Sequence, residues 1–401
     1  MVIGIIGAGA SGMAAALAAS ENKENQIIIL ERQARVGRKL LATGNGRCNL
    51  SNLHAQAGGY FGEDASFADN ALNMFHVADT RKWFEDMGLY TVAEESGRVY
   101  PYSDQANSVV DVLRFALQRE NIQLLTGCEV SRIRKSGAGF TVHTHEDAVY
   151  CDKLIVACGG LAGTKLGGSM AGYKLLRSLG HSCTKLRPAL VQLKSEWHGC
   201  KALKGVRANC HAEILKDGSV YAESKGEIQF AEYGISGPVV FEISRDVCAE
   251  PAAWSCRLDF LPDMEADELL NWLSRRPLQP AEELLTGILH NRLGRVLTSA
   301  AGIRGERKIG SLTEEERVAV CNAVKNFEIH LTEPMGMDSA QVTAGGILTS
   351  EFDPCTMESR LVPNLYACGE VLDIDGACGG YNLQWAWSSG RLAGKCAGGN
   401  E

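Results

Sequence analysis

The first 31 residues carry the feature that most restricts how this chain can fold. Residues 2–20 contain no charged side chain, and a run of this length could almost span a bilayer. A signal peptide would begin with basic residues, whereas the first charge here is Glu21. Four glycines also fall in the first half of the run instead of on one helix face. We therefore interpret the segment as a strand over 2–6, a glycine turn and a helix over 11–20, followed by a strand over 26–30.

The glycine turn has the spacing Gly7-Ala-Gly9-Ala-Ser-Gly12, which is a GxGxxG motif between a strand and a helix. In this motif the first glycine makes the turn, the second lets a pyrophosphate approach the backbone, and the third lets helix and strand pack closely. The free N–H groups and the dipole of the helix favour an anion there. An acid at the end of the second strand can accept hydrogen bonds from ribose hydroxyls. These features predict a dinucleotide site at Gly7, Gly9, Ala10, Ser11, Gly12 and Glu31, and a glycine turn without a nucleotide is the less favoured alternative.

This unit does not distinguish NAD from FAD. Residues 35–52 follow it as a glycine-punctuated stretch with Arg38, Lys39 and Arg47 and without apolar periodicity long enough for a helix. We expect a loop that contacts an anion or a flavin, although such loops are often solvated and variable. Two later segments, 151–160 and 364–371, are short apolar strands that end in glycine. Parallel strands of this kind line a cofactor crevice with their carboxyl ends.

At these segments the sequence resembles the glutathione-reductase-like class of FAD proteins, with Cys158 where the class has Thr and Glu370 where it has Asp. The chain is also similar to a bacterial flavoprotein family of aminoacetone-oxidase-like and bile-acid reductase-like proteins. The segments that carry this similarity are 37–49, 233–238, 342–346, 369–376 and 379–390. The resemblance implies FAD, bound with the N-terminus of the last helix pointing at the flavin pyrimidine ring. It also implies contacts with FAD at Arg32, Lys39, Leu40, Thr43, Gly44, Asn45, Gly46, Arg47, Cys48, Asn49, Val130, Ala157, Cys158, Gly159, Gly160, Gly369, Glu370, Gly380, Tyr381, Asn382 and Leu383.

The predicted fold is α/β: a discontinuous Rossmann-like FAD-binding domain of glutathione-reductase type, with an inserted β-rich domain and a small helical subdomain. We expect the FAD-binding domain over 1–187 and 341–401, the β-rich domain over 188–262 and the helical subdomain over 263–340. Runs at 208–215 and 239–243 are typical of strands, and Asp217-Gly218 predicts a hairpin. The leucines at 269–273 and 284–289 have helical spacing. Thr313-Glu-Glu-Glu316 predicts a capping box.

Several classes of function are disfavoured. No Cys-x-x-Cys pair occurs among the 14 cysteines, so a dithiol relay is not expected. Scattered cysteines without a secretory signal indicate a reduced, cytoplasmic protein. The nine histidines show no metal-ligand spacing, and a net charge of −8 argues against nucleic acid as the main partner. We expect no metal and no membrane association, and we interpret Trp385 and Trp387 as packing residues.

No second GxGxxG follows a strand, so either NADH or NADPH docks transiently as a co-substrate or electrons pass from substrate to oxygen. Our first hypothesis is an FAD-dependent oxidoreductase in which NAD(P)H drives reduction of an activated C=C bond in a hydrophobic small molecule through N5 of the reduced flavin. Tyr233, Tyr381 or a water would donate the proton, and no other catalytic residue is assigned. The alternatives are an oxidase of an amine or aminoketone that produces hydrogen peroxide, and a non-catalytic FAD-binding protein in RNA or assembly work.

Overall fold

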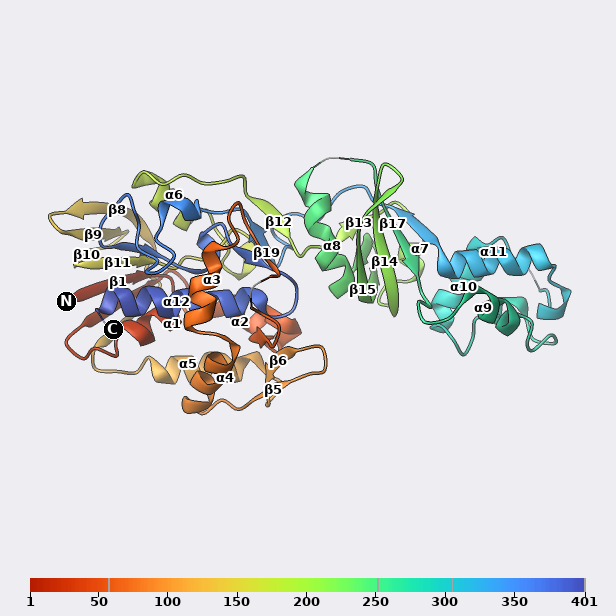
Figure 1. The fold of residues 1–401 in the computed structure, drawn as a ribbon, viewed down its shortest axis with the longest axis horizontal. Helices are drawn as coiled ribbons and strands as arrows, with labels where there is room; N and C mark the ends of the chain where they lie inside the picture. Colours follow the sequence, from red (N-terminus) through yellow and green to blue (C-terminus); the bar gives the residue numbers. More distant parts are fainter. Residues whose placement is uncertain (57, 251, 305, 400–401) are drawn as a thin grey trace. The chain divides into compact units, whose positions relative to one another are not determined.

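The chain divides into two compact units in the computed structural model, which describes residues 1–56, 58–250, 252–304 and 306–399. Figure 1 shows both units as ribbons. Unit 1 is formed by Met1–Arg187 with Gln341–Glu401, and unit 2 by Pro188–Ala340. Each unit has its own cluster of buried apolar side chains. The assignment of unit 1 to FAD, and the further division at residue 262, remain predictions.

The centre of unit 1 is a five-stranded parallel sheet in the order β20-β11-β1-β2-β7. β1 pairs on both sides, so Ile3 lies opposite Ile27 of one neighbour and Lys153 of the other. Such strands are covered on both faces, which explains their nearly continuous apolar sequences. The predicted α/β Rossmann-like architecture is confirmed by this sheet. Its strands are β1 (Val2–Ile6), β2 (Gln26–Glu31), β7 (Ile122–Thr126), β11 (Lys153–Val156) and β20 (Leu365–Ala367).

Two helices lie side by side next to this sheet, α1 (Ala10–Ala19) and α12 (Tyr381–Gly398) (Figure 1). Gly390 and Gly394 of α12 allow this close approach, because a Cβ at either position would collide with the backbone oxygen of Ser11 or Ala15 in α1. The uncharged N-terminal run is thus divided into β1 and α1, as predicted. Among the described residues, no helix is both long and apolar enough to cross a membrane.

Smaller sheets and helices complete unit 1. The strand orders are β10-β9-β8, β3-β6-β5 and β21-β4, all with antiparallel pairing. The strands are β3 (Ser51–Asn52), β4 (Tyr60–Phe61), β5 (Thr91–Ala93), β6 (Arg98–Pro101), β8 (Val130–Ser136), β9 (Gly139–Thr144), β10 (Ala148–Cys151), β19 (Val342–Ala344) and β21 (Asp375–Gly376). The remaining helices are α2 (Arg38–Ala42), α3 (Phe67–Met74), α4 (Val77–Asp86), α5 (Ala106–Ala116) and α6 (Ala171–Ser178).

Unit 2 is built on a six-stranded antiparallel sheet in the order β13-β16-β15-β14-β17-β18. The hairpin at Asp217-Gly218 is confirmed, since both residues have positive φ and join the two longest strands. The strands are β13 (Leu193–Lys194), β14 (Arg207–Lys216), β15 (Ser219–Ala231), β16 (Gly234–Ser236), β17 (Trp254–Asp259) and β18 (Phe327–His330). The last two residues of β12 (Arg187–Ala189) are the first two of the unit. The helices are α7 (Gly199–Ala202), α8 (Pro238–Ala249), α9 (Ala266–Leu273), α10 (Asn291–Ala300) and α11 (Glu314–Lys325).

Two local predictions were wrong. Residues 239–243 belong to α8 instead of a strand, because Pro238 is well suited to the first turn of a helix and the buried Val239, Val240, Ile243 and Val247 have helical spacing. The leucines at 284–289 form turns, since Gly287 has a φ of 98° that interrupts a helix. The predicted helical subdomain, 263–340, contains the strand β18, whose apolar side chains share one buried cluster with the rest of unit 2, and its separation from the β-rich part stays a prediction.

Candidate functional site

The three motif glycines between β1 and α1 occupy positions with different requirements. Gly7 has a φ of 105°, and its N–H donates to the Leu30 carbonyl at 2.9 Å. A Cβ on Gly9 would meet no atom within 4 Å, whereas a Cβ on Gly12 would collide with the Gly7 carbonyl oxygen. The first and third glycines are therefore explained by the fold itself. The second faces open space, where a ligand can approach the backbone.

The N-terminus of α1 is available to an anion. Gly9 is its N-cap, and no side chain caps the first turn in the described part of the chain. The first residues of the helix are Ala10 and Ser11, and most of α1 is buried. Unpaired N–H groups at such a helix end, together with the helix dipole, suit a phosphate group.

Glu31 lies beside this turn, at the end of β2. Its Oε2 accepts the N–H of Ala8 at 2.7 Å, and its Oε1 accepts the N–H of Gln33 at 2.8 Å. The carboxylate therefore holds the glycine turn in place, and each oxygen retains a further acceptor site. Its predicted contact with a ribose stays a prediction.

A pocket of about 380 Å³ opens beyond the end of β2. Arg32 and Val130, both predicted to contact FAD, line it. The Arg32 guanidinium donates to the Gly167 carbonyl at 2.7 Å, which fixes one wall. The size and position of this pocket suit the adenosine end of a dinucleotide. Its other lining residues are Glu129, Ser131, Arg132, Ser169, Met170, Ala171, Lys174, Leu175 and Ser178.

The stretch 35–52 is only partly the loop that we predicted. It contains the five-residue helix α2, which includes Lys39 and the buried Leu40, followed by the 3₁₀ turn η1 (Thr43–Gly46). Gly44, Asn45 and Gly46 have φ values of 56°, 56° and 87°, and these values prevent the helix from continuing. The result is a tight turn that exposes backbone groups. Two residues after this turn, burial raises the pKa of the Cys48 thiol to about 11, which disfavours a redox role.

The side chain of Arg47, which follows this turn, is bound by other residues of the protein. Its guanidinium bonds to Asp104 and, at 2.9 Å, to Glu94, and it lies 4.0 Å from the centroid of the Tyr100 ring. These contacts raise the pKa of Arg47, mainly through the hydrogen bond to Asp104. The guanidinium is therefore already occupied by protein groups.

The two glycine-ending segments 151–160 and 364–371 meet at Glu370. Its carboxylate accepts the Lys39 ammonium at 2.8 Å and the backbone N–H of Thr343 at 2.9 Å. A Cβ on Gly160 would collide with this carboxylate, so the glycine is needed for the approach. Next to it, Gly159 has a φ of 69° and faces open space. The structure thus brings the predicted Lys39, Glu370 and Gly160 together, although the sequence did not indicate the ion pair.

Cys158 lies at the end of β11, one residue beyond Ala157. Burial raises the pKa of its thiol to about 12, and its Sγ lies 3.6 Å from the Ile6 carbonyl oxygen. A small neutral side chain at this position packs against β1. The nearby Gly369 has a φ of 75°, and a Cβ at this position would collide with the Ser11 side chain.

The N-terminus of α12 is a second uncapped helix end. Gly379 and Gly380 have φ values of 110° and 104°, and no side chain caps the helix within the described residues. The Asn382 side chain bonds to both backbone groups of Gly376 at 2.8 Å, and the Tyr381 ring packs edge-on against Tyr60 at 5.7 Å. Leu383 follows in the first turn. These contacts fix the direction of the helix end.

A buried acceptor lies at this helix end. Asn49 Oδ1 is buried and has no hydrogen-bond partner among the described residues. It lies 2.9 Å from the position that a Cβ on Gly380 would occupy. An unsatisfied buried acceptor costs about 1–3 kcal/mol. A ligand with a hydrogen-bond donor would satisfy this group, and so the residues present fit a bound dinucleotide.

The tryptophans of α12 are packing residues, as predicted. Trp385 and Trp387 are 1% and 0% exposed, and the Trp387 indole donates to the Leu50 carbonyl at 2.9 Å. Of the two predicted proton donors, Tyr381 lies at the N-terminus of α12. Tyr233 belongs to unit 2 and is 40% exposed.

Sequence reasoning did not indicate Arg98 and Tyr100, which lie on one face of β6. Tyr100 is within 3.4 Å of the position of a Cβ on Gly44, and Arg98 Nε is 3.0 Å from that of a Cβ on Gly379. Both side chains therefore lie against glycines of the candidate site. The alternation of polar and apolar residues in 98–101 is the signal that predicts a common face.

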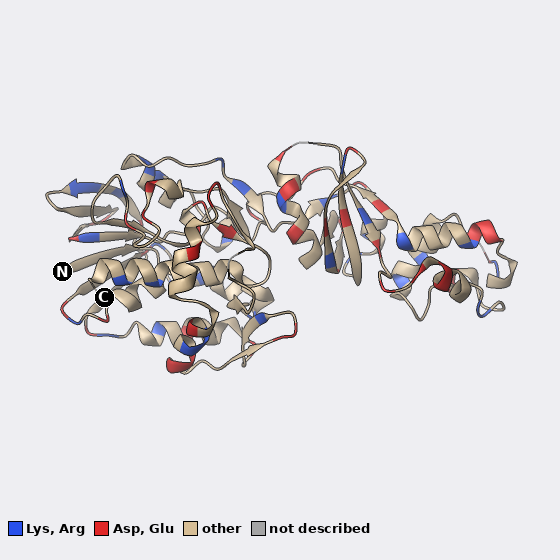
Figure 2. Ribbon diagram, in the orientation of Figure 1, with Lys and Arg blue, Asp and Glu red and all other residues tan. Residues whose placement is uncertain are grey.

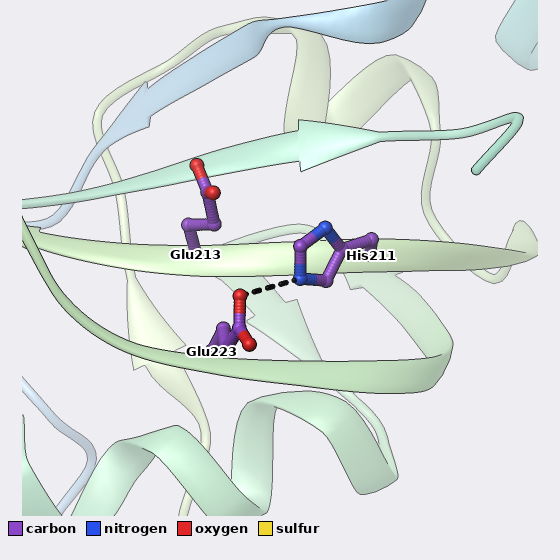
Figure 3. A group of neighbouring side chains, drawn as sticks. All are labelled: His211, Glu213 and Glu223. Carbon is purple, nitrogen blue, oxygen red and sulfur yellow. Dashed lines mark hydrogen bonds and ion pairs between the residues drawn. The ribbon is translucent and has the colours of Figure 1, made fainter. Parts of the chain in front are cut away.

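Unit 2 carries a cluster in which His211, Glu213 and Glu223 have their ligand atoms within 4.8 Å of one another (Figure 3). His211 Nε2 bonds to Glu223 at 3.1 Å. Glu213 accepts Arg257 Nε at 2.6 Å. The opposed carboxylates of Glu213 and Glu223, which face each other across β14 and β15, are thus each balanced by a neighbouring side chain. This arrangement is explained as one ion pair, Arg257 with Glu213, and one hydrogen bond, His211 with Glu223, on a sheet surface.

Comparison with known proteins relates these features to a family and to a reaction. The family model described as HI0933-like protein Rossmann domain matches residues 1–396. The chain is 41% identical over 403 residues to the 3-dehydro-bile acid delta(4,6)-reductase of Clostridium scindens, with 98% of each protein covered. It is 32% identical over 390 residues to the ribosomal RNA dihydrouridine synthase of Escherichia coli, covering 96% of this chain and 95% of that protein.

A solved structure shares the fold. The 3-ketosteroid delta1-dehydrogenase of Sterolibacterium denitrificans, in complex with 1,4-androstadiene-3,17-dione, superposes with a TM-score of 0.51. The two chains are 11% identical, and 99% of each is covered. This likeness concerns the arrangement of the elements.

Proposed function

The chain belongs to the HI0933-like family and is an FAD-dependent oxidoreductase, and we propose that it reduces an activated C=C bond of a hydrophobic small molecule with electrons from NADH or NADPH. In this reaction one carbon of the double bond gains a hydride and the other gains a proton, while NAD(P)H is oxidised to NAD(P)⁺. FAD, when bound, supplies the hydride to the substrate.

The observation that carries this proposal is the identity of 41% with a delta(4,6)-reductase over nearly the whole chain. In chemical terms, a 3-dehydro compound with double bonds at positions 4 and 6 is a conjugated ketone. Dihydrouridine, the product in the name of the second relative, likewise has one ring C=C bond fewer than uridine, and that bond is conjugated to a carbonyl. Both names are therefore consistent with reduction of a C=C bond that is conjugated to a carbonyl group.

The site geometry supports specific roles in holding FAD. We assign the diphosphate to the N-terminus of α1 beside Gly9, where the backbone is open and the helix end is uncapped. The ribose is assigned to Glu31 and the adenine to the pocket at Arg32. The uncapped end of α12 at Gly380 would favour negative charge on the flavin ring. The remaining residues that we expect at FAD are those that the family resemblance implies.

Reduction of ribosomal RNA is the second candidate, because the chain shares 32% identity with a ribosomal RNA dihydrouridine synthase. The net charge of −8 opposes it, since RNA binding draws mainly on contacts between basic side chains and phosphates. Asp and Glu also outnumber Lys and Arg in unit 2, and Figure 2 shows the two signs interspersed over its elements. We therefore prefer the small molecule.

A non-catalytic role and an oxidase activity both lack support. A non-catalytic FAD-binding protein disagrees with the oxidoreductase assignment. An amine or aminoketone oxidase has no counterpart in the names of the two relatives from Clostridium scindens and Escherichia coli. We further propose a cytoplasmic location, because all 14 cysteines are free thiols, as expected in a reducing compartment.

Anaerobic mixing tests the proposal in two steps. NADH or NADPH should bleach the blue absorbance of the bound flavin, and a 3-oxo-4-ene steroid should then restore it with formation of the saturated ketone. In parallel, the reduced protein is mixed with ribosomal RNA, and dihydrouridine is measured by mass spectrometry. Restoration of colour by RNA alone would favour the second candidate. Bleaching by aminoacetone without any response to NAD(P)H would contradict both.

A further inference from the structure

The strongest unassigned feature of unit 1 is a pair of donors on β6. Arg98 and Tyr100 are two residues apart on one strand, so their side chains share a face of the sheet β3-β6-β5. Asn52 of β3 lies directly opposite Arg98, and its side-chain amide donates to the Gly379 carbonyl at 2.8 Å. This bond ties the donor pair to the segment that leads into α12.

Neither donor is used by the protein. Among the described residues, the Arg98 guanidinium forms no hydrogen bond or ion pair, and the Tyr100 hydroxyl forms no hydrogen bond. Tyr100 is only 6% exposed, so its phenol is held in a fixed position without a protein partner for the hydroxyl. Two acids of the same region, Glu94 and Asp104, are bound by Arg47. A half-buried guanidinium and a buried phenol are thus both available to a ligand.

The surroundings indicate an oxygen that gains negative charge. Arg98 contributes a full positive charge, and the uncapped N-terminus of α12 contributes the positive end of a helix dipole. Burial raises the pKa of Tyr100, so the phenol remains protonated and can donate at neutral pH. When a hydride adds to the C=C bond of a conjugated carbonyl compound, negative charge develops on the carbonyl oxygen. Two donors on one face of a strand, one of them positively charged, would stabilise such an oxygen.

We propose that Arg98 and Tyr100 bind the carbonyl oxygen conjugated to the C=C bond of the substrate. This inference rests on the proposed function and narrows the substrate class to α,β-unsaturated carbonyl compounds. An isolated alkene would leave both donors without a partner. The hydride adds to the β-carbon, and the α-carbon then takes a proton from water as the carbonyl re-forms.

The test compares Arg98→Ala, Arg98→Lys and Tyr100→Phe with two controls. Arg134→Ala removes an exposed arginine from β8, and Tyr102→Phe removes the hydroxyl of a tyrosine that is 71% exposed. The first measurement is the rate at which NADH or NADPH bleaches the flavin, and the second is the rate at which 2-cyclohexenone or a 3-oxo-4-ene steroid restores its colour. The third is calorimetric binding of the saturated ketone to the oxidised protein.

Arg98→Ala should bleach at the wild-type rate but restore colour at least tenfold more slowly and bind the ketone at least tenfold more weakly. Arg98→Lys should recover part of this loss, and free guanidinium should partly rescue Arg98→Ala. Tyr100→Phe should show a smaller loss in the same two measurements. The controls should behave as the wild type. Rescue by guanidinium is not expected if Arg98 only maintains the fold.

Three results would overturn the inference. Wild-type ketone binding and recovery in Arg98→Ala would remove Arg98 from the substrate site while the proposed function stands. Loss of FAD or of bleaching in Arg98→Lys would assign the residue to the cofactor. If the wild-type protein neither reduces an enone nor binds the ketone, both the proposed function and this inference fail.

Discussion

Helix α1 in unit 1 and helix α11 in unit 2 begin in opposite ways. The N-cap of α11 is Thr313, which accepts the N–H of Glu316 at 3.2 Å, while the Glu316 carboxylate accepts the N–H of Thr313 at 2.9 Å. The N-cap of α1 is Gly9, and no described side chain caps it. A reciprocal cap satisfies the backbone within the chain, whereas an open end leaves donors for a ligand. The open end of α1 is therefore the one that we propose for the diphosphate.

The same contrast occurs among the glycines of α1 itself. Gly12 is required by packing, because backbone atoms of Gly7 occupy the space where a Cβ would lie. Gly9 is not required by packing, since it has a φ of −81° that alanine also adopts and open space around it. Packing does not explain this glycine beside an open helix end, which supports our proposal that the diphosphate approaches there.

The largest effect is expected from Gly12→Ala, which adds a methyl group against a backbone carbonyl. Neither group can move without separating α1 from β1, so we expect a loss of roughly 3 kcal/mol or more of folding free energy and no retained FAD. A thermal melt and the flavin content of the purified protein measure both. A stable Gly12→Ala protein that retains FAD would contradict the packing role of this glycine.

Gly9→Ala should separate binding from folding. The melting temperature of the FAD-free protein should change little, because alanine restricts the unfolded chain but is a poorer N-cap than glycine. The affinity for FAD should fall at least tenfold, about 1.4 kcal/mol, since the methyl group would stand between the helix end and the diphosphate. Fluorescence titration of the FAD-free protein measures this change. Equal affinities of Gly9→Ala and wild type would exclude the diphosphate from this helix end.

Thr313→Ala tests the closed helix end. Loss of the cap should cost about 1 kcal/mol, or about 2–4 °C in melting temperature, while the FAD content remains at the wild-type level. Thr313→Ser retains the hydroxyl and serves as the control, with a melting temperature near that of the wild type. A fall in FAD content without a change in stability would mean that the closed end of α11 also serves binding, and the contrast with α1 would fail.

These comparisons also explain what could be predicted from the sequence. Residues 2–31 were predicted almost to the residue, because the glycine spacing, the charge-free helix and the second strand are local signals that agree. The capping box at Thr313 and the hairpin at Asp217 were predicted for the same reason. In contrast, Val239 and Val240 suggested a strand by their β-branched side chains, and only Pro238 and the helical spacing of the buried residues indicate the helix.

Contacts between distant segments could not be predicted in this way. The ion pair of Lys39 with Glu370 joins α2 to a segment near the C-terminus, and Arg98 meets Gly379 only because β3 and β6 pair. The spacing of apolar residues in the sequence does not predict such contacts, because they depend on how the whole of unit 1 packs. The motif residues could therefore be predicted from the sequence, whereas the position of the donors on β6 depends on the fold.

The smallest expected effect concerns a buried histidine of unit 1 and an exposed one of unit 2. His181 is 3% exposed, its Nε2 lies 2.8 Å from Ser359 Oγ, and its ring stacks on Phe352. His198 of unit 2 is exposed. Burial lowers the pKa of His181 below its ordinary value of 6.5, so the folded protein holds this ring neutral. The two histidines should therefore differ in how their replacement changes stability with pH.

The direction in which stability changes with pH follows from proton binding at His181. Below about pH 6.5 the unfolded chain binds a proton there that the folded chain does not bind. The stability that depends on the neutral ring is thus complete above pH 6.5 and is lost as the pH falls through the lowered pKa of the folded state. Melting temperatures measured from pH 8 to pH 5 should fall more steeply for the wild type than for His181→Gln, by about 1–3 °C. His198→Gln, a change at an exposed position, serves as the control and should parallel the wild type. Identical slopes for His181→Gln and the wild type would show that the buried ring is protonated without cost.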